Sequence, residues 1–327
     1  MKYGLGKGWM GILFAVLMII TFGFAYNSVQ SNTICLAWQK AFGIEPATMG
    51  IILTALTLLI IFGGIQRVAK FSSTVVPVMA VVYLLIAVGV VIWNITSLPK
   101  VLLIIIENAF GFNQAAGGVL GVTVIQGIKR GLFSNEAGEG SAPNAAAVAT
   151  VSHPVKQGLI QALGVFTDTL VVCSCTAFII LMSGVDVTAS NGIQLTQDAL
   201  THEIGSIGNP FVAVMIWLFA FSSIIGNYYY GETNVRYIKD SRLGVFIYRL
   251  AVAAMVMIGA IVSLDFAWSF ADITMALLTL CNLAAIVLLS RQAVFLLQDY
   301  RQQKKEGKNP VFNKENMPEI ADKLEAW

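Results

Sequence analysis

Long apolar runs, separated by short polar or glycine-rich stretches, constrain this chain more than any other feature of its sequence. A helix needs about 20 mainly apolar residues to cross a bilayer, and the runs are close to or above that length. The alternating strands of a membrane β-barrel would not give apolar runs this long. The sequence therefore predicts an all-α, polytopic membrane protein with about eight transmembrane helices, at residues 8–35, 47–64, 74–95, 114–131, 157–183, 209–230, 243–263 and 267–290.

The composition supports the same class of protein. Hydrophobic residues make up 57% of the chain and charged residues only 12%, whereas soluble domains are typically about 25% charged. The sequence shows no hydrolase, nucleotide-binding or metal-ligand motif, and its four cysteines lack the spacing of a zinc site. We therefore expect no enzyme activity, no cofactor and no nucleic-acid partner.

Two shorter segments and the C-terminal region fall outside the predicted spans. Residues 98–110 are too short to cross a membrane and predict an interfacial helix. Residues 192–205 are polar and amphipathic, so they predict a helix at the surface. We expect a transmembrane domain at 1–291 and a charged cytosolic tail at 292–327.

The distribution of Lys and Arg predicts the orientation. With the N-terminus in the cytoplasm, the inner loops and the tail hold most basic residues, as the positive-inside rule requires. The inner loops then carry Lys2, Lys7, Arg67, Lys70, Lys129, Arg130, Lys156, Arg236, Lys239 and Arg242. Only Lys40 and Lys100 fall outside. We expect a multi-pass protein of the cell membrane with both termini of this chain in the cytoplasm.

The segment 127–154, GIKRGLFSNEAGEGSAPNAAAVATVSHP, interrupts the apolar pattern after the fourth span. Gly138 and Gly140 weaken a helix, whereas Ser141 and Pro143 are typical of a new helix start. In a bilayer such a break persists only where it is buried in protein or lines a wet cavity. Broken helices of this kind bind substrate and ion in transporters. The pattern is equally compatible with an ordinary cytoplasmic loop, as its basic residues suggest.

Polar side chains also occur within the predicted spans. In the first span, Asn27, Gln30 and Ser31 lie on adjoining turns and either bond to neighbouring helices or face a ligand. Asp168 in the fifth span is a functional candidate because intramembrane carboxylates are costly, although it could brace a neighbouring helix instead. Further polar groups in the sixth and eighth spans are Ser222, Ser223, Asn227, Glu232, Asp272 and Asn282.

These motifs together resemble the alanine or glycine:cation symporter family. The longest and most specific is GIKRGLFSNEAGEGSAPNAAAVA, followed by HPVKQGL and GVFTDTLVVCSCTAFIILMSG. YNSVQSN precedes them, and FSSIIGNYYYGE and DITMALLTLCNL follow, in the family's order. The resemblance covers essentially the whole chain. It implies sodium-coupled symport of alanine or glycine, by alternating access, in a membrane-embedded five-plus-five inverted-repeat fold.

The resemblance also implies roles for particular residues. It makes the fourth span and the break after it the broken sixth helix of the transporter core. It implies a substrate site of Asn27, Gln30, Phe133, Ser134, Asn135 and Asn227, a sodium site at Ser222 and Ser223, and further functional candidates at Glu136 and Asp168. Many relatives have Trp at the position of Asn227, so the size of the preferred substrate side chain stays open. Proton coupling is a further possibility, because buried carboxyls can titrate.

The chain departs from the family at its N-terminus. Family members begin with two further core helices whose glycine-, Phe- and Trp-rich signature is not matched here. We therefore expect a partial first repeat at 1–97 and a complete second repeat at 114–291. Two interpretations follow from the sequence, a sodium-coupled symporter and a non-transporting fragment or accessory membrane subunit.

Overall fold

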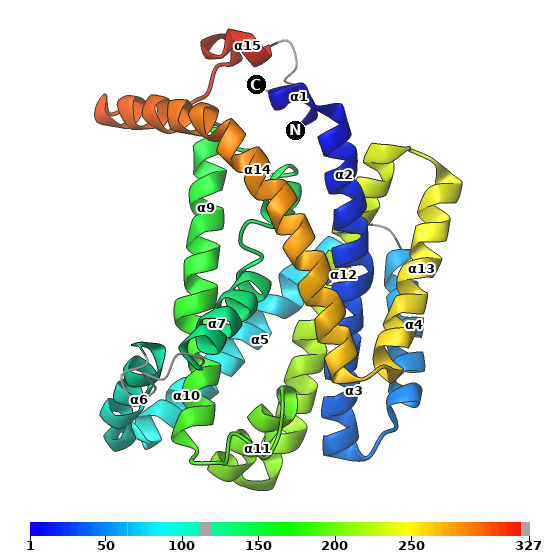
Figure 1. The fold of residues 1–327 in the computed structure, drawn as a ribbon, viewed down its shortest axis with the longest axis vertical. Coiled ribbons are helices and arrows are strands. Elements are labelled where there is room, and N and C mark those ends of the chain that lie inside the picture. The colour runs from blue at the N-terminus through cyan, green and yellow to red at the C-terminus, as the bar shows by residue number, and fades with distance from the viewer. Residues whose placement is uncertain (64, 111–118, 322–327) are drawn as a thin grey trace.

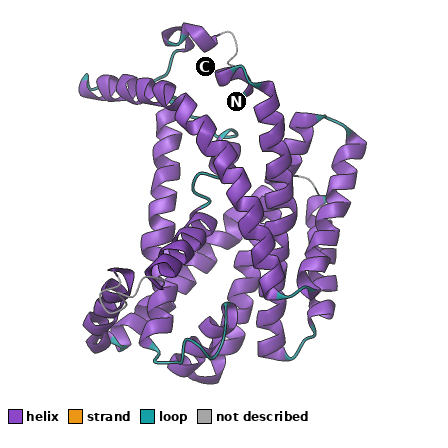
Figure 2. Ribbon diagram, in the orientation of Figure 1, coloured by secondary structure: helices purple, strands orange, loops and turns teal. Residues whose placement is uncertain are grey.

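The computed structural model describes residues 1–63, 65–110 and 119–321, and all regular structure in these ranges is helical (Figures 1 and 2). The first half of the chain forms α1 (Lys2–Leu5), α2 (Gly8–Met18), η1 (Ile19–Tyr26), α3 (Asn27–Phe42), α4 (Pro46–Ile61), α5 (Ile65–Trp93), η2 (Ile95–Ser97), α6 (Leu98–Phe110), α7 (Val119–Asn135) and α8 (Ser141–Ala146). The second half forms α9 (Pro154–Thr167), η3 (Asp168–Cys173), α10 (Ser174–Met182), α11 (Ile193–Ile204), η4 (Gly205–Ile207), α12 (Gly208–Ile238), α13 (Arg242–Ile261), α14 (Leu264–Lys305), η5 (Lys314–Asn316) and α15 (Pro318–Ala321).

Within the described ranges, five helical stretches are long and apolar enough to cross a membrane. They are Gly8–Phe42, Pro154–Met182, Ile193–Ile238, Arg242–Ile261 and Leu264–Lys305. A sixth span results if Pro77–Trp93 and Ile95–Ala109, which are bent by 73°, form one broken span. The prediction of a polytopic helical membrane protein is thus confirmed, but the predicted number of eight spans exceeds the five to six found here.

Three predicted spans are not among the helices that are long and apolar enough to cross a membrane, each for a separate reason. The second forms α4, whose 16 residues extend about 24 Å, less than the roughly 30 Å of a hydrocarbon core. The third bends sharply through η2 into α6, which has the predicted bounds of the interfacial helix. The fourth forms α7, of which 119–135 is described, whereas residues 114–118 lie outside the described residues.

Helix α12 lies at the centre of the bundle and packs against α3, η1, α5 and α11 (Figure 1). Three clusters of buried apolar side chains surround it. The first joins α3, α4, α12 and α13 through residues such as Ile34, Leu53, Phe221 and Val252. The second joins α2, η1 and α14 through Met18, Phe22 and Leu278, and the third joins α5, α10, α11 and α12 through Val90, Ile179, Leu200 and Val212.

Polar contacts fix α3 against α13. The Ser31 hydroxyl donates to the Val256 carbonyl at 2.6 Å, and the Asn32 amide donates to the Gly259 carbonyl at 3.0 Å. Of the two interpretations of Ser31, the bond to a neighbouring helix is the one observed. The helices can approach this closely because Gly259 lacks a side chain, so that only 2.5 Å separates an added Cβ from the Ser28 Cα.

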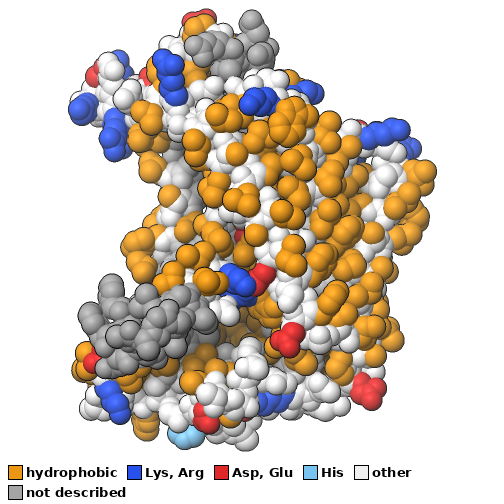
Figure 3. Space-filling model, in the orientation of Figure 1, with side chains coloured by type: hydrophobic (Ala, Val, Ile, Leu, Met, Phe, Trp, Pro, Cys, Tyr) orange, Lys and Arg blue, Asp and Glu red, His pale blue; other side chains and the backbone are white. Residues whose placement is uncertain are grey.

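The ends of the described chain meet at one end of the bundle, where α1 and α15 lie (Figure 1). Hydrophobic side chains cover the middle of the face in Figure 3, and Lys and Arg gather mostly toward that same end. Helix α14 continues without interruption to Lys305, so the predicted domain boundary at 291 lies inside it.

The segment after α14 returns to the start of α9. The Phe312 N–H donates to the Ser152 carbonyl at 2.9 Å. His153 is fully buried. Its Nδ1 accepts from the Val155 N–H, and its Nε2 lies 3.1 Å from the Asp299 carboxylate of α14. The link between α8 and α9 is therefore attached to the distal part of α14.

We expect Gly259→Ala to destabilise the fold, because the added methyl would meet the Ser28 backbone, which cannot rotate away as a side chain would. The expected loss is about 1–3 kcal/mol of unfolding free energy, measured as a lower thermal midpoint in detergent. Gly226→Ala on α12 is the matched control, because nothing lies within 4 Å of its added Cβ. Equal midpoints for both variants would contradict the close α3–α13 contact.

Candidate functional site

The predicted break in the helix is present between α7 and α8. Helix α7 ends at Asn135, and α8 begins at Ser141. Glu136, Gly138 and Gly140 all have positive φ values, of 50°, 82° and 90°. A non-glycine residue in this region is strained, so the backbone of residues 136–140, the break loop, is held by its surroundings.

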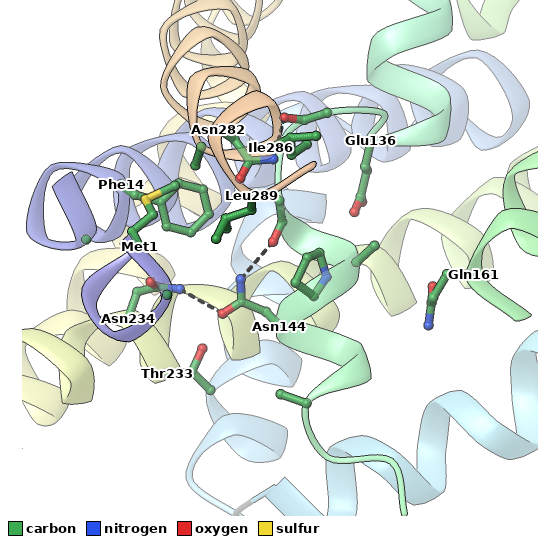
Figure 4. A pocket seen from close by; sticks show the side chains of 18 of the residues that line it. Met1, Phe14, Glu136, Asn144, Gln161, Thr233, Asn234, Asn282, Ile286 and Leu289 are labelled. Carbon is green, nitrogen blue, oxygen red and sulfur yellow. Dashed lines mark hydrogen bonds between the residues drawn. The ribbon is translucent and has the colours of Figure 1, made fainter. Parts of the chain in front are cut away.

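Three asparagine side chains hold the break loop (Figure 4). Asn282 of α14 donates to the Gly138 carbonyl at 2.8 Å, and Asn144 of α8 donates to the Gly140 carbonyl at 2.9 Å. Asn234 of α12 donates to the Asn144 side-chain oxygen at 3.3 Å. Side-chain amides thus bind backbone carbonyls that the break leaves without helical partners.

A buried bond links the loop to η1. The Tyr26 hydroxyl donates to Glu139 Oε1 at 2.7 Å, and the two side chains are 2% and 0% exposed. Sequence reasoning missed this pair, because 113 residues separate its members. Tyr26 lies in the YNSVQSN motif, and Glu139 in the SNEAG-centred one, so the only signal was their membership of two polar motifs.

Aromatic and charged side chains form a stack beside the loop. The Phe133 ring lies 4.7 Å from both Tyr26 and Trp268, measured between ring centroids. The Arg130 guanidinium lies 4.1 Å from the centroid of the Trp268 ring, a cation–π arrangement. These contacts connect α7, η1 and α14 on one side of the break.

Arg130 and Lys129 both pair with Asp272 of α14, at 2.5 Å and 3.3 Å. Asp272 lies about 12 Å along α14 from Leu264, given the rise of a helix. The sequence-based assignment of Lys129 and Arg130 to a loop was wrong, because both residues belong to α7. They lie within α7, partway along the bundle, because one carboxylate and one aromatic ring compensate their charge there.

The end of α7 also contacts the π-helical segment η3. The Ser134 hydroxyl donates to Asp168 Oδ2 at 2.7 Å, and Asn135 Oδ1 accepts from the Thr169 hydroxyl at 2.6 Å. Both η1 and η3 are π-helical, a distortion that is frequent at functional sites, and each supplies a residue bound at the break. The structure thus brings together four of the predicted site residues, Ser134, Asn135, Glu136 and Asp168.

A cavity of about 770 Å³ begins at the break loop and extends toward α1. Its polar lining includes Asn135, Glu136, Asn144, Asn234 and Asn282 around the break, and Lys2 of α1, whereas apolar side chains form most of the remaining wall. In Figure 4, Glu136 and Gln161 lie on one side, opposite Phe14 and Met1. Of the predicted site residues that the structure describes, Asn135 and Glu136 line this cavity.

The other predicted residues lie on α3 and α12. Asn27 is fully buried; its Nδ2 donates to the Gly23 carbonyl, and its Oδ1 has no partner among the described residues. Gln30 is half-buried one turn further along α3. Asn227 is 4% exposed, and its Nδ2 has no partner in the described part of the chain. The hydroxyls of Ser222 and Ser223 both donate to the Phe219 carbonyl.

A helix broken among polar groups, inside a bundle of apolar helices and beside a cavity, defines a polytopic membrane transporter. The model of the sodium:alanine symporter family matches residues 1–314, and the chain belongs to this family. Proteins of this family are transporters rather than enzymes, and their transport is sodium:amino-acid symport.

Several curated relatives are similar over nearly all of this chain. The probable sodium/glutamine symporter GlnT of Bacillus subtilis is 54% identical over 96% of this chain and 66% of its own length. The amino-acid carrier protein AlsT of Bacillus subtilis is 51% identical over 99% of this chain and 69% of its own length. The sodium/alanine symporter AgcS of Methanococcus maripaludis is 34% identical over 94% of this chain and 68% of its own length. The chain thus spans about two thirds of the length of these relatives.

We expect Tyr26→Phe to destabilise the chain, because it removes the hydroxyl that donates to buried Glu139. The expected loss is about 1–3 kcal/mol of unfolding free energy, the usual cost of leaving a buried polar atom unpaired. Tyr83→Phe is the control, since that hydroxyl pairs with Thr176 rather than with a carboxyl. The measurement is denaturant unfolding in mixed micelles, and a larger loss for Tyr83→Phe would contradict the importance of the Glu139 bond.

Proposed function

We propose that this protein carries out sodium-coupled symport of a small neutral amino acid, alanine or glycine, by alternating access. The broken helix α7–α8 is the observation that carries this proposal, because such a break offers amide and carbonyl groups to a zwitterion at the middle of a bundle. We further propose that the protein lies in the cell membrane with both ends of this chain in the cytoplasm.

The two sides of the break differ in a way that suits one state of an alternating-access cycle. The cavity extends from Glu136 toward the bundle end that holds α1. On the opposite side, Tyr26, Phe133 and Trp268 pack together, and Arg130 is paired with Asp272. With the proposed orientation, the cavity beside the break faces the cytoplasm, and the packed aromatic side chains face the outside.

The proposed substrate site consists of Asn27, Gln30, Phe133, Ser134, Asn135 and Asn227. Two observations support it: the Oδ1 of Asn27 and the Nδ2 of Asn227 are buried without partners in the described residues. An amide oxygen suits the substrate ammonium, and an amide nitrogen suits its carboxylate. Unsatisfied buried polar atoms are costly, so a bound amino acid would also stabilise this part of the bundle.

The proposed sodium site includes the hydroxyls of Ser222 and Ser223. Both use their hydrogen in a bond to the Phe219 carbonyl, which leaves oxygen lone pairs free to bind a hard cation. Glu136 and Asp168 stay further functional candidates, and neither takes part in an ion pair among the described residues.

Glutamine is a second candidate substrate. The relative with 54% identity is named as a probable sodium/glutamine symporter. Asn227 also leaves more room than the Trp that the resemblance implies at this position. A smaller residue in the wall of the site would admit a longer substrate side chain.

The direct test is uptake of radiolabelled alanine into vesicles, in sodium or choline buffer. Two proteins are compared, this chain and a version extended by the N-terminal core helices of a relative. We expect sodium-dependent accumulation with the extended version and a loss of roughly 100-fold for its Gln30→Ala variant, because a polar contact to the substrate is removed. Thr33→Ala is the matched control, since the Thr33 hydroxyl bonds within its own helix.

Uptake that proceeds equally well without sodium would contradict the coupling. Accumulation that follows a pH gradient in sodium-free buffer would show that protons, rather than sodium ions, are the coupling ion. A folded extended protein that takes up no amino acid would favour the accessory membrane subunit instead.

The choice of substrate is tested by competition. We expect unlabelled glutamine to inhibit alanine uptake in the unchanged protein. In the Asn227→Trp variant, glutamine inhibition should weaken by about 10-fold relative to glycine inhibition, since added bulk excludes the longer side chain first. Retained alanine uptake serves as the folding control. Equal sensitivity to glutamine in both proteins would show that Asn227 does not limit substrate size.

A further inference from the structure

Glu139 is a buried carboxyl that is only half satisfied. None of its side chain is exposed. Oε1 accepts the Tyr26 hydroxyl at 2.7 Å, whereas Oε2 has no hydrogen-bond partner among the described residues. An ionised carboxylate in such a position is strongly destabilising unless a cation compensates its charge.

The basic residues nearest along the chain do not supply that cation. Lys129 and Arg130 both pair with Asp272 on α14. The described ion pairs do not include Glu139. The buried Glu139 carboxyl thus has no described basic partner of the kind that stabilises Asp272.

The neighbouring carboxyls make an ionised Glu139 less favourable still, and Lys2 of α1, which lines the cavity with Glu136, takes part in none of the described ion pairs. Glu136, in the same loop, acts on it with a like charge. Asp168 of η3 acts in the same way on Glu136. The groups that face this region from the packed elements are Tyr26 of η1, Lys129 and Arg130 of α7, Asp168 of η3, Tyr230 of α12 and Asp272 of α14.

The nearby side-chain amides already donate to backbone carbonyls. Asn282 donates to the Gly138 carbonyl, and Asn144 donates to the Gly140 carbonyl. These bonds satisfy the backbone on either side of Glu139. For the carboxyl itself, the described surroundings provide one hydroxyl.

We propose that Glu139 is a proton-binding site, protonated while the break loop is seated against Tyr26. One proton, taken from bulk water, turns the carboxylate into a neutral acid. The burial cost then falls from that of an unpaired charge to the smaller cost of one unpaired polar atom. When the loop leaves Tyr26 and water reaches the carboxyl, the proton returns to bulk water. Its contribution to coupling rests on the proposed symport, but the protonation itself does not.

The test is infrared spectroscopy of the purified 327-residue chain in lipid nanodiscs, in sodium-free buffer at neutral pH. We expect a C=O stretching band of a protonated carboxyl that is lost in Glu139→Gln. The band should remain in Glu136→Gln and Asp168→Asn, the matched controls. It should shift in Tyr26→Phe, which keeps Glu139 but removes its hydrogen-bond donor, so the assignment does not depend on one variant's folding.

Two results would overturn the proposal. The first is the absence of any protonated-carboxyl band that Glu139→Gln removes. The second is a band that disappears when sodium replaces choline at constant pH, which would make sodium the resident cation. Because the measurement needs no transport, a failure of the uptake experiment would leave its outcome unchanged.

Discussion

A broken helix inside an apolar bundle must satisfy its own backbone without water, and the rest of this structure is arranged around that constraint. Between Asn135 and Ser141 the chain leaves the helix, and its carbonyls lose their helical donors. Each unsatisfied group would cost several kcal/mol in hydrocarbon. Amides from α14 and α8 replace the missing donors. The break is thus an ordered element, bound both by the helix that follows it, α8, and by α14, which is distant in sequence.

The charged side chains inside the bundle also need partners in place of water. Lys129, Arg130 and Asp272 meet partway along the bundle, where isolated charges would be costly. The face of the Trp268 ring stabilises the remaining positive charge through a cation–π contact with Arg130. The carboxyls of the break loop and η3 have no such basic partner in the described chain. Neutral hydroxyl groups bind there instead: Tyr26 donates to Glu139, and Ser134 donates to Asp168.

Local sequence predicted the features that depend on local chemistry. The apolar runs indicate the helices, and the glycines, Ser141 and Pro143 indicate where α7 ends and α8 begins. Pairings across long separations, such as Tyr26 with Glu139, could not be predicted, since nothing in either motif specifies its partner. The π-helical turns η1 and η3 leave no sequence signal either. Counting basic residues placed Lys129 and Arg130 in a loop because that rule ignores partners such as Asp272.

The predicted number of spans was wrong for geometric reasons. Hydropathy treats an apolar run as straight, whereas the third run bends by 73° into α6. It also accepts α4, whose 16 residues are short for a bilayer. The predicted roles of Asn27, Gln30, Asn227, Ser222 and Ser223 concern ligands, and they stay predictions.

The length of α14 has a mechanical consequence. One uninterrupted helix of 42 residues carries Asp272, Asn282 and Asp299, which contact α7, the break loop and the start of α9. About 15 Å separates the first two positions along the axis, and about 40 Å the first and the last. The helix is continuous over this distance, although its C-terminal part turns in a new direction (Figure 1). Because all three attachments belong to one continuous helix, a displacement of α14 would affect the closed side of the site and the start of α9 together.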